Sequence, residues 1–381
     1  MAITGIICEY NPLHLGHAKQ LAWLRAKDPE GIIVCIMSGN FVQRGKPAIV
    51  DKMTRAKAAI LCGADLVLEL PVTAALSSAE GFASEGVRLL GSFCQQLCFG
   101  AEDADEEGLM AIARALLSEG FSPELTQQLE RGLSFPAARQ AALEAMGVDA
   151  DLLSKPNNIL AVEYCKAILA QGLEMRILPI CRQGSYHDEA ADAENPSATA
   201  VRSLMVQSGA WLDYVPEAAR ECFRHAPMHR LSAGERAVLA KLRTMTEEDF
   251  SALPYGSEGL WRKLMHAAAE QTTLEQILTA TKSKRYTRSR LDRMVMCAFL
   301  GITEAMLAQN APYARVLALN DRGREALKLA RQSGHYPNIG EKIDHPYQDL
   351  ENRCGDLYGL FAVDAPEAPG LEAAYRVYYQ K

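Results

Sequence analysis

Two histidines near the N-terminus have the type and spacing of groups that bind phosphate. His14 and His17 flank Leu15 and Gly16 in the stretch "NPLHLGH", directly after the apolar run "GIICEY". Imidazoles can donate hydrogen bonds to phosphate oxygens, and a glycine lets a nucleotide approach the backbone closely because it has no Cβ atom. The helical pattern that follows, "AKQLAWLRA", would direct its first free amides to the same place. The stretch is therefore suited to binding an anion.

Two other interpretations of these histidines stay open at this level. Histidines three residues apart beside Cys8 could form half of a zinc site, and either imidazole could simply cap the local structure. The position of the stretch favours phosphate, because the first strand-to-helix turn of a doubly wound sheet commonly carries the phosphate site.

Strand-like apolar runs alternate with helical patterns through the first half of the chain. The runs are "GIICEY", "GIIVCIMSG", "DLVLEL", "QLCFGA" and "MRILPI". Strands separated by segments with a period of 3.6 residues indicate crossover connections and a parallel sheet. We expect an α/β, Rossmann-like domain over residues 1–205, with a helical insertion at about 103–171, and a mainly helical second domain over 206–381.

Composition narrows the class of protein. With 381 residues, of which 49% are hydrophobic, the chain can bury the cores of two domains. The start of the sequence does not resemble a signal peptide, and no apolar stretch approaches the roughly 18 residues of a membrane span, so we expect a cytoplasmic protein without membrane contact. Ten cysteines scattered through apolar runs predict reduced thiols. The net charge of −7 argues against nucleic-acid binding by the whole surface, but it allows a local basic patch.

A second set of phosphate-binding groups lies in "NPSATAVR", residues 195–202. Ser197 and Thr199 carry hydroxyl donors at an expected helix start, and Arg202 adds a guanidinium one turn on from Ala198. The alternative is an ordinary helix cap followed by a solvated arginine.

The segment "KSKRYTRSRLDR", residues 282–293, holds six cations around Tyr286, and Asp292 is its only acid. The apolar pattern of the helix that follows predicts that Arg290 and Arg293 point away from the core. A focused cationic face with an aromatic ring fits RNA, although a solvated basic helix is the alternative. The expected RNA-binding residues are Lys282, Lys284, Arg285, Tyr286, Arg288 and Arg290.

Several stretches carry a resemblance to known families. His-x-Gly-His after a first strand resembles the signature of the nucleotidyltransferase superfamily, and "NPSATAVR" resembles its later motif, which holds the outer phosphates of ATP. In more detail, "EYNPLHLGH", "SGNFVQRGKPAIVDKMTRAKAAILCGADLVLELP", "FGAE", "KPNNILAVEY", "RQGSYHDE", "PSATAVR" and "KRYTRSRLDRM" resemble the tRNA(Met) cytidine acetate ligase family. The resemblance runs from the first strand past residue 320.

This resemblance implies a ligase that makes acetyl-adenylate from acetate and ATP, and then acetylates N4 of the wobble cytidine of elongator methionine tRNA. It implies that His14 and His17 are catalytic, and that Mg²⁺ accompanies ATP, held by phosphates and water. Family members usually have Phe and Asn where this chain has Leu13 and Leu15. The implied ATP-binding residues are Ile6, Ile7, Cys8, Glu9, Tyr10, Asn11, Pro12, Leu13, His14, Leu15, Gly16, His17, Gly100, Asn157 (or its neighbour Asn158), Arg182, Gln183, Ser197, Thr199 and Arg202.

The loop "SGNFVQRGK", residues 38–46, is expected at the mouth of the same cleft. A small carboxylate needs few contacts, and one arginine with an amide donor would suffice. We therefore place acetate or the target cytosine near Asn40, Arg44 and Arg55, with a solvated basic loop as the alternative. Two other functions stay open: a small-molecule adenylyltransferase of the same superfamily, and a non-catalytic RNA-binding protein.

Overall fold

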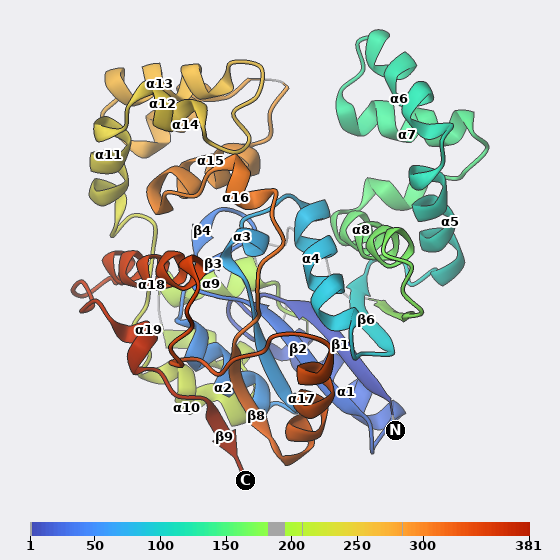
Figure 1. The fold of residues 1–381 in the computed structure, drawn as a ribbon, viewed down its shortest axis with the longest axis vertical. Coiled ribbons are helices and arrows are strands. Elements are labelled where there is room, and N and C mark those ends of the chain that lie inside the picture. The colour runs from blue at the N-terminus through green and yellow to red at the C-terminus, as the bar shows by residue number, and fades with distance from the viewer. Residues whose placement is uncertain (1, 182–194, 208, 284) are drawn as a thin grey trace.

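A mostly parallel sheet forms the centre of the computed structural model, which describes residues 2–181, 195–207, 209–283 and 285–381 (Figure 1). Within these residues the sheet has seven strands in the order β7-β6-β1-β2-β5-β8-β9. Strands β1 (Ile3–Cys8), β2 (Ile32–Ser38), β5 (Leu66–Leu70), β6 (Gln96–Ala101) and β7 (Arg176–Cys181) run parallel. Strand β8 (Val316–Asn320) runs antiparallel to β5, and β9 (Tyr378–Gln380) runs parallel to β8.

The central strands are continuous apolar runs because helices cover both faces of the sheet. Successive residues of β2 face different cores: Val34 belongs to the core that contains Val87 of α4, whereas Cys35 belongs to the core that contains Ala56 of α2. The covering helices include α1 (Leu15–Lys27), α2 (Lys52–Leu61), α4 (Ala79–Gly91) and α17 (Asp321–Ser333). Two short strands, β3 (Phe41–Val42) and β4 (Lys46–Pro47), form a separate hairpin after β2, and α3 (Val72–Ala75) follows β5.

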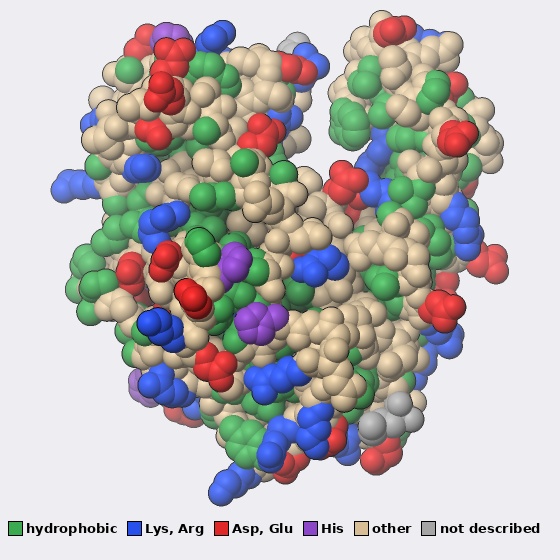
Figure 2. Space-filling view, viewed as in Figure 1, with side chains coloured by type: hydrophobic (Ala, Val, Ile, Leu, Met, Phe, Trp, Pro, Cys, Tyr) green, Lys and Arg blue, Asp and Glu red, His purple; other side chains and the backbone are tan. Residues whose placement is uncertain are grey.

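Helices between β6 and β7 form one of two lobes above the sheet (Figure 1). They are α5 (Glu106–Leu117), α6 (Phe121–Glu130), α7 (Phe135–Ala145), the 3-10 turn η1 (Asp151–Ser154) and α8 (Pro156–Ala170). Helices α6 and α7 pack on each other at the tip, while α8 packs on α4 beside the sheet. Figure 2 shows a hollow between this lobe and the second one.

The second lobe has its own apolar core, at the centre of which lies α15 (Arg288–Leu300). Around it are α11 (Glu235–Thr244), α12 (Glu247–Ser251), α13 (Leu260–Glu270), α14 (Leu274–Thr281) and α16 (Glu304–Leu307). The chain reaches this lobe through α9 (Ala198–Gln207), η2 (Gly209–Tyr214) and α10 (Glu217–Arg224). No helix in the described part of the chain is both long and apolar enough to cross a membrane.

The end of the chain returns to the sheet. After the second lobe come β8, α17, α18 (Pro346–Tyr358), η3 (Gly359–Phe361), α19 (Leu371–Ala374) and β9. The domain boundary at residue 206 stays a prediction. The sheet, however, contains strands that come before this residue and strands that come after it. The run "VLALN" has the buried apolar pattern of a strand, yet nothing in it shows that it pairs with β5, more than 240 residues earlier in the sequence.

Candidate functional site

The turn after β1 lies where the connections of the sheet diverge. Strand β1 is flanked by β2 on one side and by β6 on the other. Because β1, β2, β5, β6 and β7 are parallel, their carboxyl ends meet at one edge, and ligands of such sheets bind outside that edge at the point of divergence. The structure thus brings the predicted residues after β1 and at the end of β6 to the same edge.

His14 and His17 both bond to the backbone of this turn. His14 is the N-cap of α1: its Nδ1 accepts a hydrogen bond from the Gly16 amide at 3.2 Å, and the His14 amide donates to His17 Nδ1 at 3.3 Å. The two rings stack with their centroids 3.7 Å apart. Because each Nδ1 acts as an acceptor, each neutral ring carries its proton on Nε2. Both imidazoles therefore hold Nε2–H as a hydrogen-bond donor.

This geometry is compatible with both phosphate binding and helix capping by the two histidines, whereas it adds no observation in favour of a zinc site. Both histidines do cap the helix start, but capping occupies Nδ1 and does not conflict with a donor role for Nε2–H. For zinc, the described residues contain no group of three or more His, Cys, Asp or Glu side chains that could hold a metal ion.

The segment from residue 195 to 202 packs directly on residues 11–17, which follow β1 and which we call the His turn. Arg202 Nη1 donates to the Asn11 carbonyl at 2.7 Å, and Lys19 Nζ donates to Asn195 Oδ1 at 2.8 Å. A Cβ on Gly16 would lie 4.0 Å from the Pro196 carbonyl oxygen. The two stretches that were predicted to bind phosphate thus lie side by side in the structure. The sequence analysis did not select Lys19. Its position, a lysine in the first turns of the helix after the histidines, could have indicated it.

Within that segment, the predicted side chains also shape the helix start. Ser197 Oγ accepts from the Ala200 amide at 3.0 Å, so it caps α9, and Arg202 Nη2 donates to Thr199 Oγ1 at 3.1 Å. The hydroxyls and the guanidinium are therefore held together at one helix N-terminus, which favours bound anions.

At the end of β6, a carboxylate organises the start of α8. Gly100 pairs with Ile180 of β7 one position before the strand ends. Glu102 Oε1 then accepts from the Asn157 side-chain amide at 2.7 Å, and Glu102 Oε2 accepts from the Asn158 amide at 2.9 Å. Asn158 is fully buried and bonds back to the Glu102 amide, so its role is structural, whereas Asn157 is half-buried. Glu102 therefore holds the start of α8 through its hydrogen bonds to Asn157 and Asn158.

Two further ATP-binding predictions, Arg182 and Gln183, and the tRNA-binding prediction Lys284 lie outside the described residues. The last described residue before them, Cys181, is the end of strand β7 as described and lies at the same edge of the sheet.

The substrate loop, residues 38–46, touches the turn after β1. Glu9 Oε1 accepts from the Gln43 amide at 2.8 Å. Asn40 is buried, and its Oδ1 accepts from the Lys52 amide at 2.9 Å, while Arg44 is exposed. The loop therefore lies next to the carboxyl end of β1, and its contact with substrate stays a prediction.

Arg55 has a different place from the one expected. It is fully buried and donates to the carbonyl oxygens of Val50 at 2.9 Å, Glu9 at 2.6 Å, Ser38 at 3.0 Å and Gly39. Burial lowers the pKa of this guanidinium by desolvation. The geometry disfavours the predicted contact with acetate or cytosine, because Arg55 holds the ends of β1 and β2 together with its donors. The sequence "KMTRAKAAI" gave no sign that this arginine is buried.

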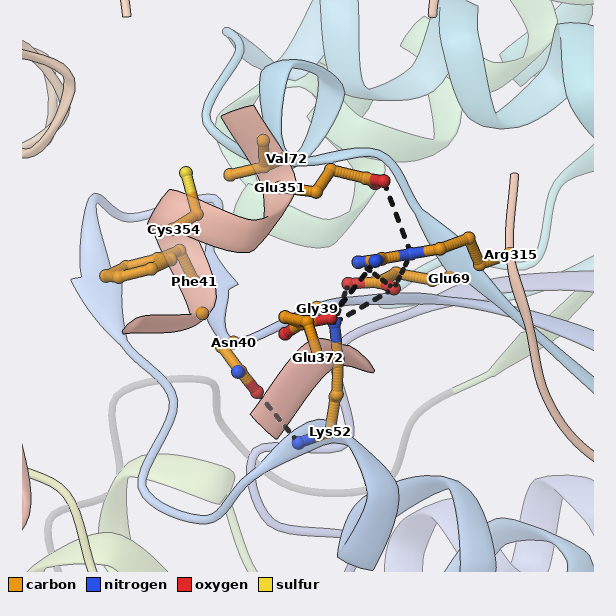
Figure 3. A pocket seen from close by; sticks show the side chains of 11 residues that line it. Gly39, Asn40, Phe41, Lys52, Glu69, Val72, Arg315, Glu351, Cys354 and Glu372 are labelled. Atoms are coloured by element: carbon orange, nitrogen blue, oxygen red, sulfur yellow. Dashed lines mark hydrogen bonds and ion pairs between the residues drawn. The ribbon is translucent and has the colours of Figure 1, made fainter. Parts of the chain in front are cut away.

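Behind the same loop lies a buried charge cluster, formed by Lys52, Glu69, Arg315, Glu351 and Glu372 (Figure 3). Lys52 Nζ lies 2.9 Å from Glu69 and 2.6 Å from Glu372. Arg315 lies 2.8 Å from Glu69, 3.3 Å from Glu351 and 3.0 Å from Glu372. Sequence reasoning identified none of these residues.

The predicted tRNA-binding residues lie on and before α15, and several have acidic partners. Arg285 and Tyr286 bond to Glu258 at 2.8 and 2.7 Å, and Arg288 bonds to Glu275 at 2.6 Å. Arg290 stacks on Tyr286 and donates to the Tyr255 carbonyl, and Lys282 is exposed. These acids come from other parts of the fold, so the segment is less cationic than its own sequence indicates.

One orientation predicted for this segment is wrong. Arg293 is 8% exposed and lies between Tyr255 and the substrate loop, so it does not point away from the core. The helical period placed it opposite the apolar stripe, but a second element, the β3–β4 hairpin, covers that side of α15.

Comparisons with known proteins agree with this geometry. The family model described as HIGH Nucleotidyl Transferase matches residues 1–367. The tRNA(Met) cytidine acetate ligase of Clostridium acetobutylicum is 35% identical over 372 residues, which cover 92% of each chain. That of Acetivibrio thermocellus is 33% identical over 366 residues, which cover 89% of this chain and 88% of the other.

Two solved structures of Thermotoga maritima TmcAL are also similar over the full length of both chains. The apo form has a TM-score of 0.90 at 28% identity. The form bound with alpha-thio ATP has a TM-score of 0.87 at 29% identity. The chain therefore belongs to the HIGH nucleotidyl transferases and, among them, to the tRNA(Met) cytidine acetate ligase family of enzymes.

Proposed function

We propose that this protein activates acetate with ATP and transfers the acetyl group to N4 of the wobble cytidine of elongator methionine tRNA. The observation that carries the proposal is the meeting of the His turn with the segment 195–202 at the carboxyl end of β1. A relative of the same family has been solved with alpha-thio ATP, which supports ATP as the nucleotide. Free cysteines throughout the chain support a cytoplasmic location.

The first step forms a mixed anhydride. An acetate oxygen attacks the α-phosphorus of ATP, the bond from that phosphorus to the bridging oxygen breaks, and pyrophosphate leaves. Negative charge on the phosphate oxygens is then stabilised by the Nε2–H donors of His14 and His17. Arg202 joins the His turn to α9, so its contact with the Asn11 carbonyl keeps the two groups of donors in register.

In the second step, N4 of cytidine attacks the acetyl carbonyl carbon, the bond to the phosphate oxygen of AMP breaks, and N4 loses a proton. This requires the tRNA to reach the nucleotide edge. The segment 282–293 adjoins the substrate loop, because residues 292 and 293 contact Gly45. Its ion pairs with Glu258 and Glu275 are exposed, and such pairs are typically worth about 0 to 1 kcal/mol, so tRNA phosphates can displace the carboxylates.

Mg²⁺ is the expected companion of ATP. The described residues contain no cluster of acidic or histidine side chains that would hold the ion directly. Its ligands in this proposal are therefore ATP phosphates and water, and no step above depends on a protein ligand.

The test is incubation with ATP, Mg²⁺ and labelled acetate, with and without tRNA. We expect pyrophosphate release and acetyl-adenylate without tRNA, and label in tRNA when it is added. Adenylate without transfer would indicate a small-molecule adenylyltransferase, and tRNA binding without adenylate would indicate a non-catalytic RNA-binding protein.

A variant of the His turn makes the test specific. His17→Ala should lower acetyl-adenylate formation by roughly a hundredfold or more, the scale of one lost electrostatic donor. His225→Ala is the matched control, because His225 is an exposed histidine after α10. A folded His17→Ala protein with the wild-type rate would refute the assignment.

A further inference from the structure

Arg293 is a buried cation with few partners. Its guanidinium lies over the Tyr255 ring at 5.0 Å from the centroid, and Nη1 donates to the Gln43 carbonyl at 3.4 Å. Among the residues that the structure describes, no carboxylate forms an ion pair with it, and its buried Nε has no hydrogen-bond partner. Asp292, the adjacent acid, pairs with Arg288 instead.

Burying a charged group in this way costs free energy, so a functional role would explain why the arginine is there. A buried charge without an opposite charge or a full set of hydrogen bonds loses much of its solvation energy. Arg55 shows the usual solution in this protein, since its guanidinium donates to four backbone carbonyls. Arg293 has one such contact, and that contact is to the substrate loop.

The β3–β4 hairpin, residues 41–47, is held from two sides. On the nucleotide side, Glu9 accepts from the Gln43 amide at 2.8 Å. On the other side, Gly45 has a φ of +71°, and a Cβ there would lie 2.4 Å from the Arg293 amide nitrogen and 2.5 Å from the Asp292 carbonyl carbon. The backbones of the hairpin and α15 are therefore in direct contact, which only glycine permits at this position.

The same hairpin thus links the turn after β1 to the helix that carries the predicted tRNA-binding residues. Tyr255 strengthens the link, because its ring covers Arg293 while its hydroxyl donates to the Leu76 carbonyl after α3. The two groups that Arg293 contacts, the Tyr255 ring and the Gln43 carbonyl, belong to the second lobe and to the substrate loop, and not to the His turn or residues 195–202.

We propose that Arg293 is a positioning residue for acetyl transfer: through the Gln43 carbonyl it fixes the hairpin against α15, so that a tRNA bound along residues 285–290 presents its cytidine to acetyl-adenylate. This inference rests on the proposed function. It predicts that loss of Arg293 separates the two chemical steps, because the phosphate-binding groups that we assign to the first step lie in the His turn and residues 195–202, whereas the second step needs the hairpin in register with the tRNA.

The experiment compares the two steps in full-length Arg293→Gln, Arg293→Lys and the wild type. For Arg293→Gln, transfer from preformed acetyl-adenylate at saturating tRNA should fall about tenfold or more, since small misplacements of reactants cost this much or more. Acetyl-adenylate formation without tRNA and the Kd for tRNA should each stay within about threefold. Arg293→Lys keeps the charge without the planar stack and should be intermediate.

Two further variants control the result. Gly45→Ala perturbs the same joint from the hairpin side and should reproduce the selective loss of transfer. Arg262→Gln removes another arginine that stacks on an aromatic ring, Trp261, and should change neither step.

The possible outcomes separate the inference from the proposed function. Equal loss of both steps, or a Kd increase that accounts for the slower transfer, would overturn the role of Arg293. If the wild type itself made no acetyl-adenylate or transferred no acetyl group to tRNA, the proposed function would fall first, and this inference with it.

Discussion

The buried charge cluster and the basic segment before α15 contain the same kinds of ion pair in opposite settings. Lys52 and Glu372 are each 2% exposed as side chains and lie 2.6 Å apart. Arg288 and Glu275 are equally close, at 2.6 Å, but their side chains are 39% and 69% exposed. Distance alone therefore does not distinguish a pair that holds the fold from one that can exchange partners.

The degree of burial determines which of the two ion pairs holds the fold and which can exchange partners. The cluster joins residues of α2, β5, α18 and α19 with Arg315 just before β8, and so it fastens the end of the chain to the central sheet (Figure 3). Removing one member would leave opposite charges without water or a partner. In the basic segment, water and salt can replace either partner at little cost. The first region is suited to stability, and the second to binding.

The largest expected effect is on the buried side of this comparison. Lys52→Ala removes the cation shared by Glu69 and Glu372, and breaking a buried pair typically costs about 3 to 5 kcal/mol of unfolding free energy. Denaturant unfolding would measure it. Lys328→Ala is the control, because Lys328 pairs with Glu325 on the surface and should cost less than about 1 kcal/mol. Equal, small losses would show that water reaches the cluster.

The cluster should also make stability depend on pH. Burial raises the pKa of Glu351 to about 7, although the charge of Arg315 opposes the shift and Glu69 adds to it. The other groups that face it are Lys52, Tyr313, Tyr347, Cys354 and Glu372. Because an unfolded glutamate titrates near about 4.3, the folded state binds more protons between that pH and about 7. The contribution of Glu351 to stability should therefore fall as pH rises through this window.

Glu351→Gln tests that dependence, because glutamine cannot titrate. Relative to the wild type in the same buffers, the variant should gain on the order of 2 kcal/mol of unfolding free energy between pH 5 and about 8. The difference between the two proteins isolates Glu351 from Glu69, whose pKa is held below its usual value: burial would raise it, but Arg315 and Lys52 outweigh burial. Parallel pH profiles would contradict the assignment.

The same contrast explains what the sequence could and could not predict. The His turn and the cap at Ser197 depend on neighbours within a few residues, so their pattern is visible in the sequence. The buried charge cluster combines residues up to 320 positions apart, and each of them alone has the character of an ordinary surface charge. Pairing of distant elements, such as β5 with β8, has no local signal.

The arginines show this limit most clearly. Arg55 and Arg293 were expected at a substrate loop and on an open helix face, and both are buried. Helical periodicity shows which side of a helix is apolar, but it does not show whether another element covers the polar side. Likewise, Arg285 pairs with Glu258 and Arg288 pairs with Glu275. Both glutamates lie outside the basic segment.

On the exposed side, the aromatic ring is expected to matter more than any single charge. Tyr286→Ala should weaken tRNA binding by about 1 to 3 kcal/mol through loss of a base stack, with little change in the dependence of affinity on salt. Tyr286→Phe keeps the ring but loses the hydroxyl that donates to Glu258, so it should bind nearly as the wild type does. Equal losses in the two variants would show that the bond to Glu258, and not stacking, supports binding.

The smallest effect on stability, and the sharpest contrast with Lys52→Ala, is expected for Arg285→Ala. Its exposed pair with Glu258 should contribute no more than about 1 kcal/mol to unfolding. Arg288→Ala should cost more, because its second partner, Asp292, is 7% exposed as a side chain and would be left without its cation. If each arginine exchanges its carboxylate for a tRNA phosphate, each variant should reduce the magnitude of the slope of log affinity against log salt by about 0.7 to 0.9. The test is to measure the free energy of unfolding and the affinity for tRNA of each variant across one salt series. A large stability loss with an unchanged slope would mean that these pairs brace the second lobe, as the buried cluster braces the sheet, and that tRNA contacts another surface.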